Sequence, residues 1–198
     1  MAALLISAII GVPIGTWLAL TRFPGKGVVT ALVYTGMGLP PVVVGLVVYL
    51  FLSHSGPFGF LSWLFSFPAM VTAQIVLATP TLVGMTTSSI LAIDPGLRIQ
   101  LRALGATPIQ STITLLIEAR SGLIIAVVAG FGSIISEVGA VMLVGGNIDG
   151  RTRVLTTVIV LETGQGNFDR ALAYGLILLF VSFVINLLMV LLQHGSRR

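Results

Sequence analysis

The chain has 198 residues, of which 56% are hydrophobic and only 8% are charged. A soluble domain carries roughly a quarter charged residues, so this composition excludes an ordinary soluble protein and indicates an all-α integral membrane protein. The net charge of +4 is small and is carried by loops, so it orients the chain in a bilayer and is no footprint for nucleic acid.

The hydropathy pattern predicts about five transmembrane helices in a single membrane domain that covers residues 1–198. The predicted spans are residues 1–21, 27–52, 69–92, 121–144 and 171–192. Met1 opens directly on apolar sequence, without a basic segment or a small-residue cleavage site. We therefore expect no removable signal peptide and a natural N-terminus that extends beyond Met1.

The second span is interrupted near its middle by Pro40 and Pro41. Two adjacent prolines remove two backbone donors, and the first one also restricts Leu39. Broken backbone at membrane depth is tolerated where it lines a cavity or is buried in protein. We expect a kink or break here that shapes a pathway; a plain proline kink is the alternative.

A polar loop at about residues 93–120 separates the third and fourth spans. Asp94 is placed to cap a helix with Pro95 at its first position, and Gly105 is placed to end that helix in a left-handed conformation. Thr107, Pro108 and Gln110 have the spacing of a capping box that starts a second helix. The sequence therefore predicts a pair of short helices outside the bilayer, the first of them amphipathic: Leu97, Leu101 and Leu104 share one face, and Arg98 and Arg102 lie four apart on the next.

A second polar region, at about residues 145–170, follows the fourth span. Its apolar part, residues 154–161, is too short to cross a bilayer and predicts a short gate helix lying against the membrane face. Arg151 and Arg153 lie in this region, and Glu137 lies within the preceding span. An acid at membrane depth should face the interior or a partner, so Glu137 either lines a pathway or has a structural role as a hydrogen-bond acceptor or as the partner of an arginine.

The distribution of cations predicts the orientation of the chain. If the polar loop is cytoplasmic, that side carries seven cations against three on the other side. The cytoplasmic set is Arg22, Lys26, Arg98, Arg102, Arg120, Arg197 and Arg198, and the external set is Arg151, Arg153 and Arg170. By the positive-inside rule we expect the N-terminus outside and the C-terminus in the cytoplasm.

Catalytic and nucleotide-binding motifs are absent from the sequence. It contains no GxxxxGK[ST] phosphate loop, no HExxH, no GxSxG and no cysteine. We therefore expect that the chain is not an enzyme and binds no metal or cofactor of its own.

The polar loop resembles the cytoplasmic loop of ABC importer permeases, which carries an EAA…G pattern. Gly105, within residues 102–106 (RALGA), matches the glycine of that pattern. The EAA positions read IQL at residues 99–101, and the later I-x-L-P reads LLIE at residues 115–118, so both depart from the pattern.

Four other segments extend the resemblance over nearly the whole chain. Residues 22–26 (RFPGK) and 39–45 (LPPVVVG) are similar to molybdate-type oxyanion permeases, and residues 136–147 (SEVGAVMLVGGN) and 152–163 (TRVLTTVIVLET) are most similar to their tungstate branch.

The resemblance implies a type I ABC importer permease that transports an oxyanion, most simply tungstate. It implies a second copy of the chain, a cytoplasmic ABC ATPase dimer that holds ATP and Mg²⁺, and an external solute-binding protein that selects the anion. The ATPase would be contacted by Arg98, Leu101, Arg102, Leu104, Gly105 and Ala106. The pathway or gate would involve Pro40, Pro41, Glu137, Asn147, Arg151 and Arg153.

Several alternatives remain open at the level of the sequence. The transported solute could be molybdate, sulfate or another small solute, and outside the class the chain could be a stand-alone channel or secondary carrier. A carrier has no need of a capped helix pair on its cytoplasmic side and often shows internal repeats, of which the two halves show none. Arg151 and Arg153 either attract a dianion at the external mouth or pair with Asp149, Glu137 or Glu162.

Overall fold

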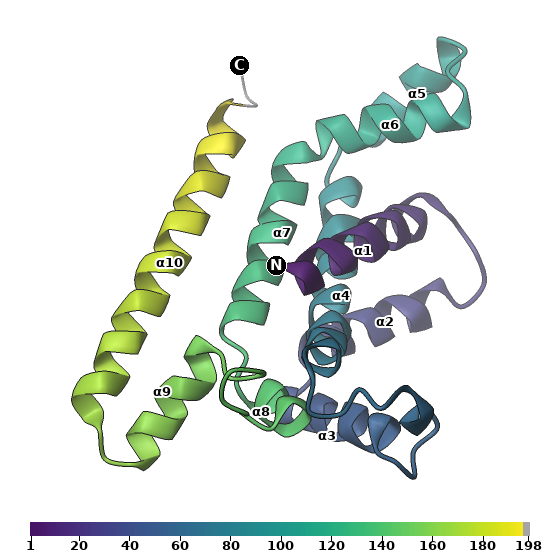
Figure 1. Cartoon of the computed structure of the whole chain (residues 1–198). Helices are drawn as coiled ribbons and strands as arrows, with labels where there is room; N and C mark the ends of the chain where they lie inside the picture. Colours follow the sequence, from purple (N-terminus) through teal and green to yellow (C-terminus); the bar gives the residue numbers. More distant parts are fainter. Residues whose placement is uncertain (196–198) are drawn as a thin grey trace.

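The structure is a computed structural model that describes the backbone of residues 1–195 and the side chains up to residue 191. Every regular element in this range is a helix, as expected (Figure 1). The helices are α1 (Ala2–Leu20), α2 (Lys26–Met37), α3 (Pro41–Leu52), the 3-10 helix η1 (Gly59–Leu61), α4 (Phe67–Leu91), α5 (Pro95–Ala103), α6 (Pro108–Glu118), α7 (Arg120–Ile135), α8 (Gly139–Gly145), α9 (Leu155–Gly164) and α10 (Phe168–Gly195). Arg197 and Arg198, which entered the charge count, lie outside the described residues.

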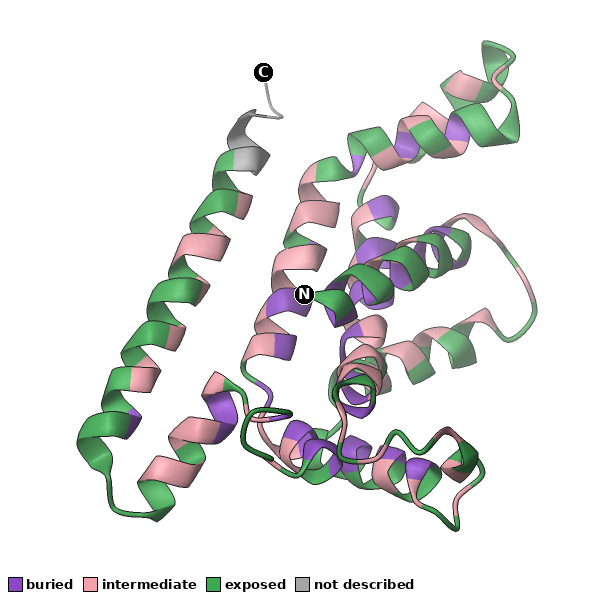
Figure 2. Ribbon diagram, in the orientation of Figure 1, coloured by how far each residue is buried: buried purple, intermediate pink, exposed green. Residues whose placement is uncertain are grey.

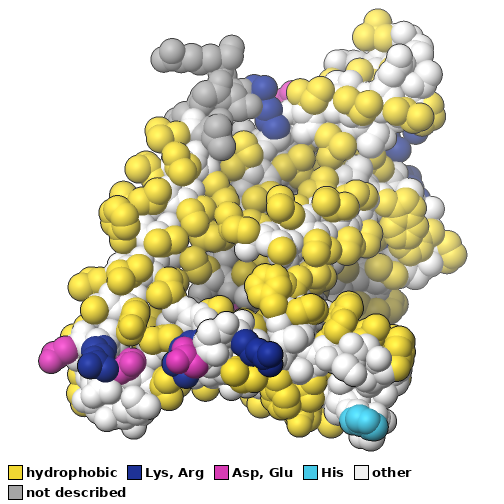
Figure 3. All heavy atoms as spheres, viewed as in Figure 1, with side chains coloured by type: hydrophobic (Ala, Val, Ile, Leu, Met, Phe, Trp, Pro, Cys, Tyr) yellow, Lys and Arg dark blue, Asp and Glu magenta, His cyan; other side chains and the backbone are white. Residues whose placement is uncertain are grey.

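Three helices, α1, α4 and α10, are long and apolar enough to cross a membrane. Two bent pairs bring the total to five if each pair is one span: α2 with α3, bent by 101°, and α6 with α7, bent by 67°. Hydrophobic side chains cover the middle of the surface, and the charged side chains gather toward its two ends (Figure 3). This distribution is that of a bilayer-embedded protein with two polar faces.

The centre of the fold is α4, against which α1, α2, α7 and α8 pack (Figure 1). Close approach of α1 depends on Gly11 and Gly15: an added Cβ would lie 2.7 Å from Leu82 at the first position and 2.7 Å from a backbone oxygen of α4 at the second. The hydroxyl of Thr87 donates to the Gly15 carbonyl at 3.1 Å. Buried residues concentrate along this contact (Figure 2). Within a bilayer there is no hydrophobic driving force for helix association, so close packing of small residues and interhelical hydrogen bonds hold the helices together.

The fourth span ends earlier than the sequence predicts. We expected a helix to residue 144, but α7 ends at Ile135 and the chain turns before the seven-residue helix α8. Helix α8 packs on α3, where a Cβ on Gly45 would lie 2.5 Å from the Cα of Ala140. This tertiary contact holds α8 out of line with α7, and apolar composition alone does not reveal it.

Candidate functional site

The polar loop forms the helix pair that the sequence predicts (α5 and α6, residues 94–118; Figure 1). It is termed the coupling hairpin here, after the role that the resemblance implies. The Asp94 carboxylate accepts a hydrogen bond from the Gly96 amide at 2.9 Å and caps α5. Gly105 is left-handed, with φ +80°. Thr107 and Gln110 form the reciprocal hydrogen bonds of a capping box at the start of α6. The hairpin's local geometry is thus fixed by its own caps.

The hairpin carries apolar side chains that no described part of the chain covers. Leu104 is 83% exposed and Ile99 is 70% exposed. Leu104 was expected on the same face as Leu97 and Leu101; it lies just beyond the end of α5 and is exposed, whereas the other two are half-buried. Ile99, which sequence reasoning did not single out, adds a second exposed apolar side chain to the hairpin. The sequence signal for this exposed side chain was an isoleucine that does not share the helix face of Leu97 and Leu101.

The other hairpin residues predicted to contact the ATPase differ in how exposed they are to a partner. Gly105 and Arg102 are exposed and Ala106 is half-buried. Arg98 reaches back across the fold, and its Nη2 donates to the Leu20 carbonyl at the end of α1 at 3.1 Å. This bond ties the hairpin to the end of α1, a candidate membrane span.

The break at Pro40 and Pro41 is confirmed. Pro40 is the extended residue before α3 and Pro41 is its first residue, both exposed, and the pair α2–α3 bends sharply between Met37 and Pro41. The start of α3 lies against the start of α8, since a Cβ on Gly139 would meet the Val42 side chain at 2.7 Å. Two interrupted helices therefore meet at their breaks.

Glu137 lies at the second of these breaks and is 6% exposed. Its Oε1 accepts a hydrogen bond from the Ala140 amide at 2.6 Å, in the first turn of α8, and its backbone carbonyl accepts one from the Thr156 hydroxyl at 3.4 Å. A carboxylate at a helix N-terminus satisfies an otherwise orphaned donor. The Glu137 carboxylate therefore acts as a hydrogen-bond acceptor at the start of α8, which is one of the roles considered from the sequence.

The arginines of the second polar region are distributed unevenly. Arg153 Nη1 lies 2.9 Å from the Asp149 carboxylate, while Arg151 is exposed. Of the pairing partners considered from the sequence, Asp149 is the one observed among the described side chains. Asn147 has φ +48°, and its buried Oδ1 has no hydrogen-bond partner within the described part of the chain.

A cavity of about 690 Å³ brings some of the predicted pathway residues together. Glu137, Asp149, Arg153 and Thr156 line it, together with apolar side chains of α1, α4, α7 and α10. Pro40, Pro41, Asn147 and Arg151 do not line it. Helix α7 runs from the coupling hairpin at Arg120 to this cavity, so the two candidate sites are joined by one continuous helix. Among the side chains of residues 1–191, no group of three or more His, Cys, Asp or Glu is arranged to hold a metal ion.

The chain thus has a capped hairpin at one end of α7 and two interrupted helices that meet at its other end. The family of binding-protein-dependent transport system inner membrane components matches residues 11–198. The chain belongs to this family and is an ABC importer permease.

Individual relatives agree with this class. The chain is 43% identical over 192 residues to a probable anion ABC transporter permease protein of Haloferax volcanii, covering 94% of this chain and 83% of the relative. It is 41% identical over 191 residues to the tungstate uptake system permease protein TupB of Peptoclostridium acidaminophilum, covering 96% and 83%. The TupB protein of Campylobacter jejuni is 33% identical over 165 residues, covering 83% and 69%.

Solved structures support the fold independently. A chain of the MetNI methionine ABC transporter, described as inward facing, superposes with a TM-score of 0.76 at 24% identity. The match covers 100% of this chain and 92% of that one. At this identity the likeness establishes the fold alone, which is that of a type I importer permease.

Proposed function

We propose that this chain forms the translocation pathway of an ATP-driven importer for an oxyanion, most simply tungstate. The observation that carries the substrate class is the 41% and 33% identity to two permeases named for tungstate uptake. A molybdenum permease ModB at 30% identity and a sulfate permease CysT at 27% are more distant, so molybdate and sulfate are the alternative solutes.

The partners proposed are a second copy of the chain, a cytoplasmic ABC ATPase dimer and an extracytoplasmic solute-binding protein. The exposed Ile99 and Leu104 on the coupling hairpin support the ATPase contact, because apolar side chains outside the bilayer are stabilised when a partner covers them. ATP and Mg²⁺ are held by the ATPase subunits, and the chain itself binds no cofactor and has no catalytic residue. High-affinity selection of the anion is left to the solute-binding protein.

The proposed mechanism follows from the connections between elements. ATP-driven closure of the ATPases moves the coupling hairpin as a rigid body. Helix α7 passes this movement to the break at Glu137, and the Arg98 bond to Leu20 passes part of it to α1. Because α8 packs on α3 at Gly45, displacement of α8 also displaces the start of α3 and changes the opening between the interrupted helices.

The test is reconstitution of the permease with its ATPase and solute-binding protein in proteoliposomes. Tungstate is expected to stimulate ATP hydrolysis at lower concentration than molybdate, and sulfate is expected to have little effect. Failure of any ATPase to co-purify would refute the coupling role. Equal stimulation by tungstate and sulfate would refute the substrate assignment and leave the permease class intact.

A further inference from the structure

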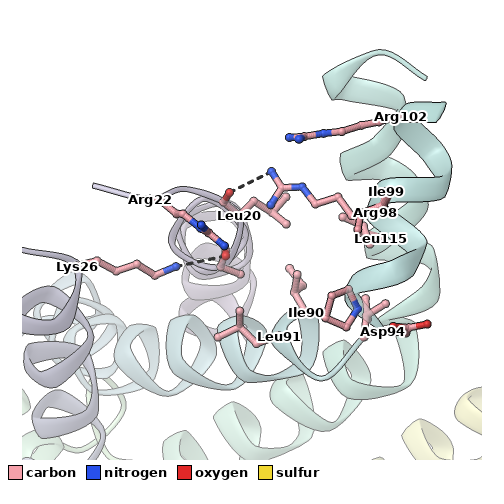
Figure 4. A pocket seen from close by; sticks show the side chains of 13 residues that line it. Leu20, Arg22, Lys26, Ile90, Leu91, Asp94, Arg98, Ile99, Arg102 and Leu115 are labelled. Atoms are coloured by element: carbon pink, nitrogen blue, oxygen red, sulfur yellow. Dashed lines mark hydrogen bonds between the residues drawn. The ribbon is translucent and has the colours of Figure 1, made fainter. Parts of the chain in front are cut away.

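A cavity of about 830 Å³ lies at the end of the molecule that carries the coupling hairpin, and it is distinct from the cavity at Glu137. It is bounded by the end of α1, the start of α2, the end of α4 and the coupling hairpin (Figure 4). Because α1 and α4 are candidate membrane spans that end here, at Leu20 and Leu91, the cavity lies at the depth of the bilayer surface.

Four cations line this cavity: Arg22, Lys26, Arg98 and Arg102. Arg98 and Arg102 reach from α5 toward the end of α1, where Arg22 and Lys26 lie (Figure 4). From the sequence, Arg98 and Arg102 were expected to share one face of the first hairpin helix and to contact the ATPase. The structure also groups them with two cations more than 70 residues earlier in the chain. This grouping was not accessible from local spacing.

No described acidic side chain neutralises the positive charge of this cluster. Lys26 donates to the Ala19 and Thr21 carbonyls at 3.3 and 3.0 Å, and Arg98 donates to the Leu20 carbonyl, so these two cations cap the end of α1. Among the described side chains, no acid lies within ion-pair distance of any of the four.

The one acidic side chain of the lining does not compensate the four cations. Asp94 accepts the hydrogen bond that caps α5, and its carboxylate points away from the cations (Figure 4). The cluster therefore keeps a net positive charge and attracts an anion to the end of the membrane spans.

The rest of the lining is apolar and includes Leu20, Ile90, Leu91, Ile93, Ile99 and Leu115. A small, fully hydrated anion gains nothing from such walls. A phospholipid does, because its phosphate can meet the cations while its glycerol backbone and upper acyl chain contact the aliphatic side chains.

We propose that this cavity binds the headgroup phosphate of an anionic phospholipid from the leaflet that faces the coupling hairpin. That leaflet is the cytoplasmic one if the orientation proposed from charge holds. A lipid held here bridges the end of α1 and the hairpin, so it stabilises the arrangement through which the proposed coupling movement passes. Binding itself requires neither ATPase nor transported solute.

The test is native mass spectrometry of the full chain purified in detergent, titrated with phosphatidylglycerol or with phosphatidylcholine of the same acyl chains. The wild-type chain is expected to retain phosphatidylglycerol in clear preference. Substituting both Arg22→Gln and Arg102→Gln is expected to weaken that binding roughly tenfold or more, because each cation near an anionic lipid adds severalfold to the affinity. The caps of α1 come from Lys26 and Arg98, so replacing the side chains of Arg22 and Arg102 leaves these caps intact.

The matched control replaces Arg151→Gln and Arg170→Gln, which removes the same charge from exposed residues at the other polar face. This control is expected to bind phosphatidylglycerol as the wild-type chain does. Equal loss in both double variants, or no preference for phosphatidylglycerol in the wild type, would overturn the proposal.

Two further measurements separate other occupants of the cavity. Displacement of the lipid by inorganic phosphate would assign the site to a soluble anion, and complete displacement by the ATPase subunit would assign it to a subunit contact; either result overturns the lipid site. If the double variant does not fold, the wild-type chain alone tests the proposal. Raising the salt concentration from about 0.1 to about 1 M must weaken its binding of phosphatidylglycerol and leave its binding of phosphatidylcholine unchanged. A complex that couples to its ATPase but fails this test keeps its proposed function without the lipid site.

Discussion

Glu137 is nearly buried in an apolar part of the chain, and its carboxylate satisfies the Ala140 amide at the start of α8. Removing a partner from a buried donor costs the desolvation of that donor, about 1–3 kcal/mol. Glu137→Ala is therefore expected to lower the free energy of unfolding by about that amount, and Glu137→Gln, which keeps an acceptor oxygen, by less. The thermal midpoint in detergent measures both.

The control for this prediction is Glu118→Ala, since Glu118 is exposed at the end of α6. It is expected to change the midpoint little. If Glu137→Ala were as stable as Glu118→Ala, the capping bond would have no energetic weight, and the burial of Glu137 would need another reason.

Arg153 permits a test of whether the arginines of the second polar region act on the transported solute. Under the proposed function, Arg153→Ala lowers the initial rate of oxyanion uptake at low ionic strength, by up to about tenfold, because a cation at the mouth concentrates a dianion. Assembly with the ATPase should be unchanged. Arg170→Ala, at an exposed arginine at the start of α10, is the matched loss of charge.

The Asp149 partner separates this role from a structural one. If the ion pair serves only to hold the loop, Asp149→Ala lowers uptake as much as Arg153→Ala does. If the arginine attracts the anion, removing the neighbouring negative charge maintains or raises uptake. Unchanged uptake in Arg153→Ala would dispose of the electrostatic role altogether.

At the scale of the element, the coupling hairpin could be predicted almost completely because its determinants are local. Asp94, Gly105, Thr107 and Gln110 act on amides within three residues or on their own backbone, and each does what its position in the sequence indicates. Helix α8 could not be predicted in this way. Its separation from α7 depends on Glu137 acting as a cap and on Gly45 admitting Ala140, a contact about 95 residues distant in the chain.

The turn of the hairpin can be tested with two equivalent glycines. Gly105 and Gly166 have φ +80° and +79°, and an added Cβ meets nothing within 4 Å at either position. Gly→Ala at each should therefore cost the same, about 1–2 kcal/mol for a left-handed alanine, without any clash. Both variants are expected to show similar decreases in thermal midpoint.

Only the hairpin glycine is expected to affect coupling. Gly105→Ala should reduce co-purification with the ATPase and solute-stimulated ATP hydrolysis, whereas Gly166→Ala, in the connection between α9 and α10, should leave both unchanged. Equal effects on ATP hydrolysis would mean that global stability, and not the shape of the hairpin, limits coupling.

For the whole molecule, composition identifies a helical membrane protein, but the path of the chain through the bilayer depends on contacts between distant elements. The hydropathy of residues 27–52 and 121–144 is continuous, yet both segments are interrupted. Pro40 and Pro41 predict the first interruption, whereas the expected helix over residues 121–144 did not include the second. The interruptions lie together because α3 and α8 pack on each other and on α4. The four cations of the hairpin cavity are likewise assembled from two stretches of the chain, residues 22–26 and 98–102. Both the meeting of the two interruptions and the grouping of the four cations depend on tertiary contacts, which sequence periodicity does not reveal.

The predicted orientation is a property of the whole molecule that the absence of cysteine makes simple to measure. A single cysteine introduced by Arg102→Cys or by Arg170→Cys marks the two polar faces, and both positions are exposed. In intact cells, a membrane-impermeant maleimide is expected to label R170C, while R102C should be labelled only after the membrane is disrupted. Arg22→Cys gives an independent marker beside the hairpin and should behave as R102C does. The reverse labelling pattern would mean that the chain has the opposite orientation, with the coupling hairpin on the side away from a cytoplasmic ATPase. Labelling of all three in intact cells would contradict the separation of the two charged faces by a bilayer.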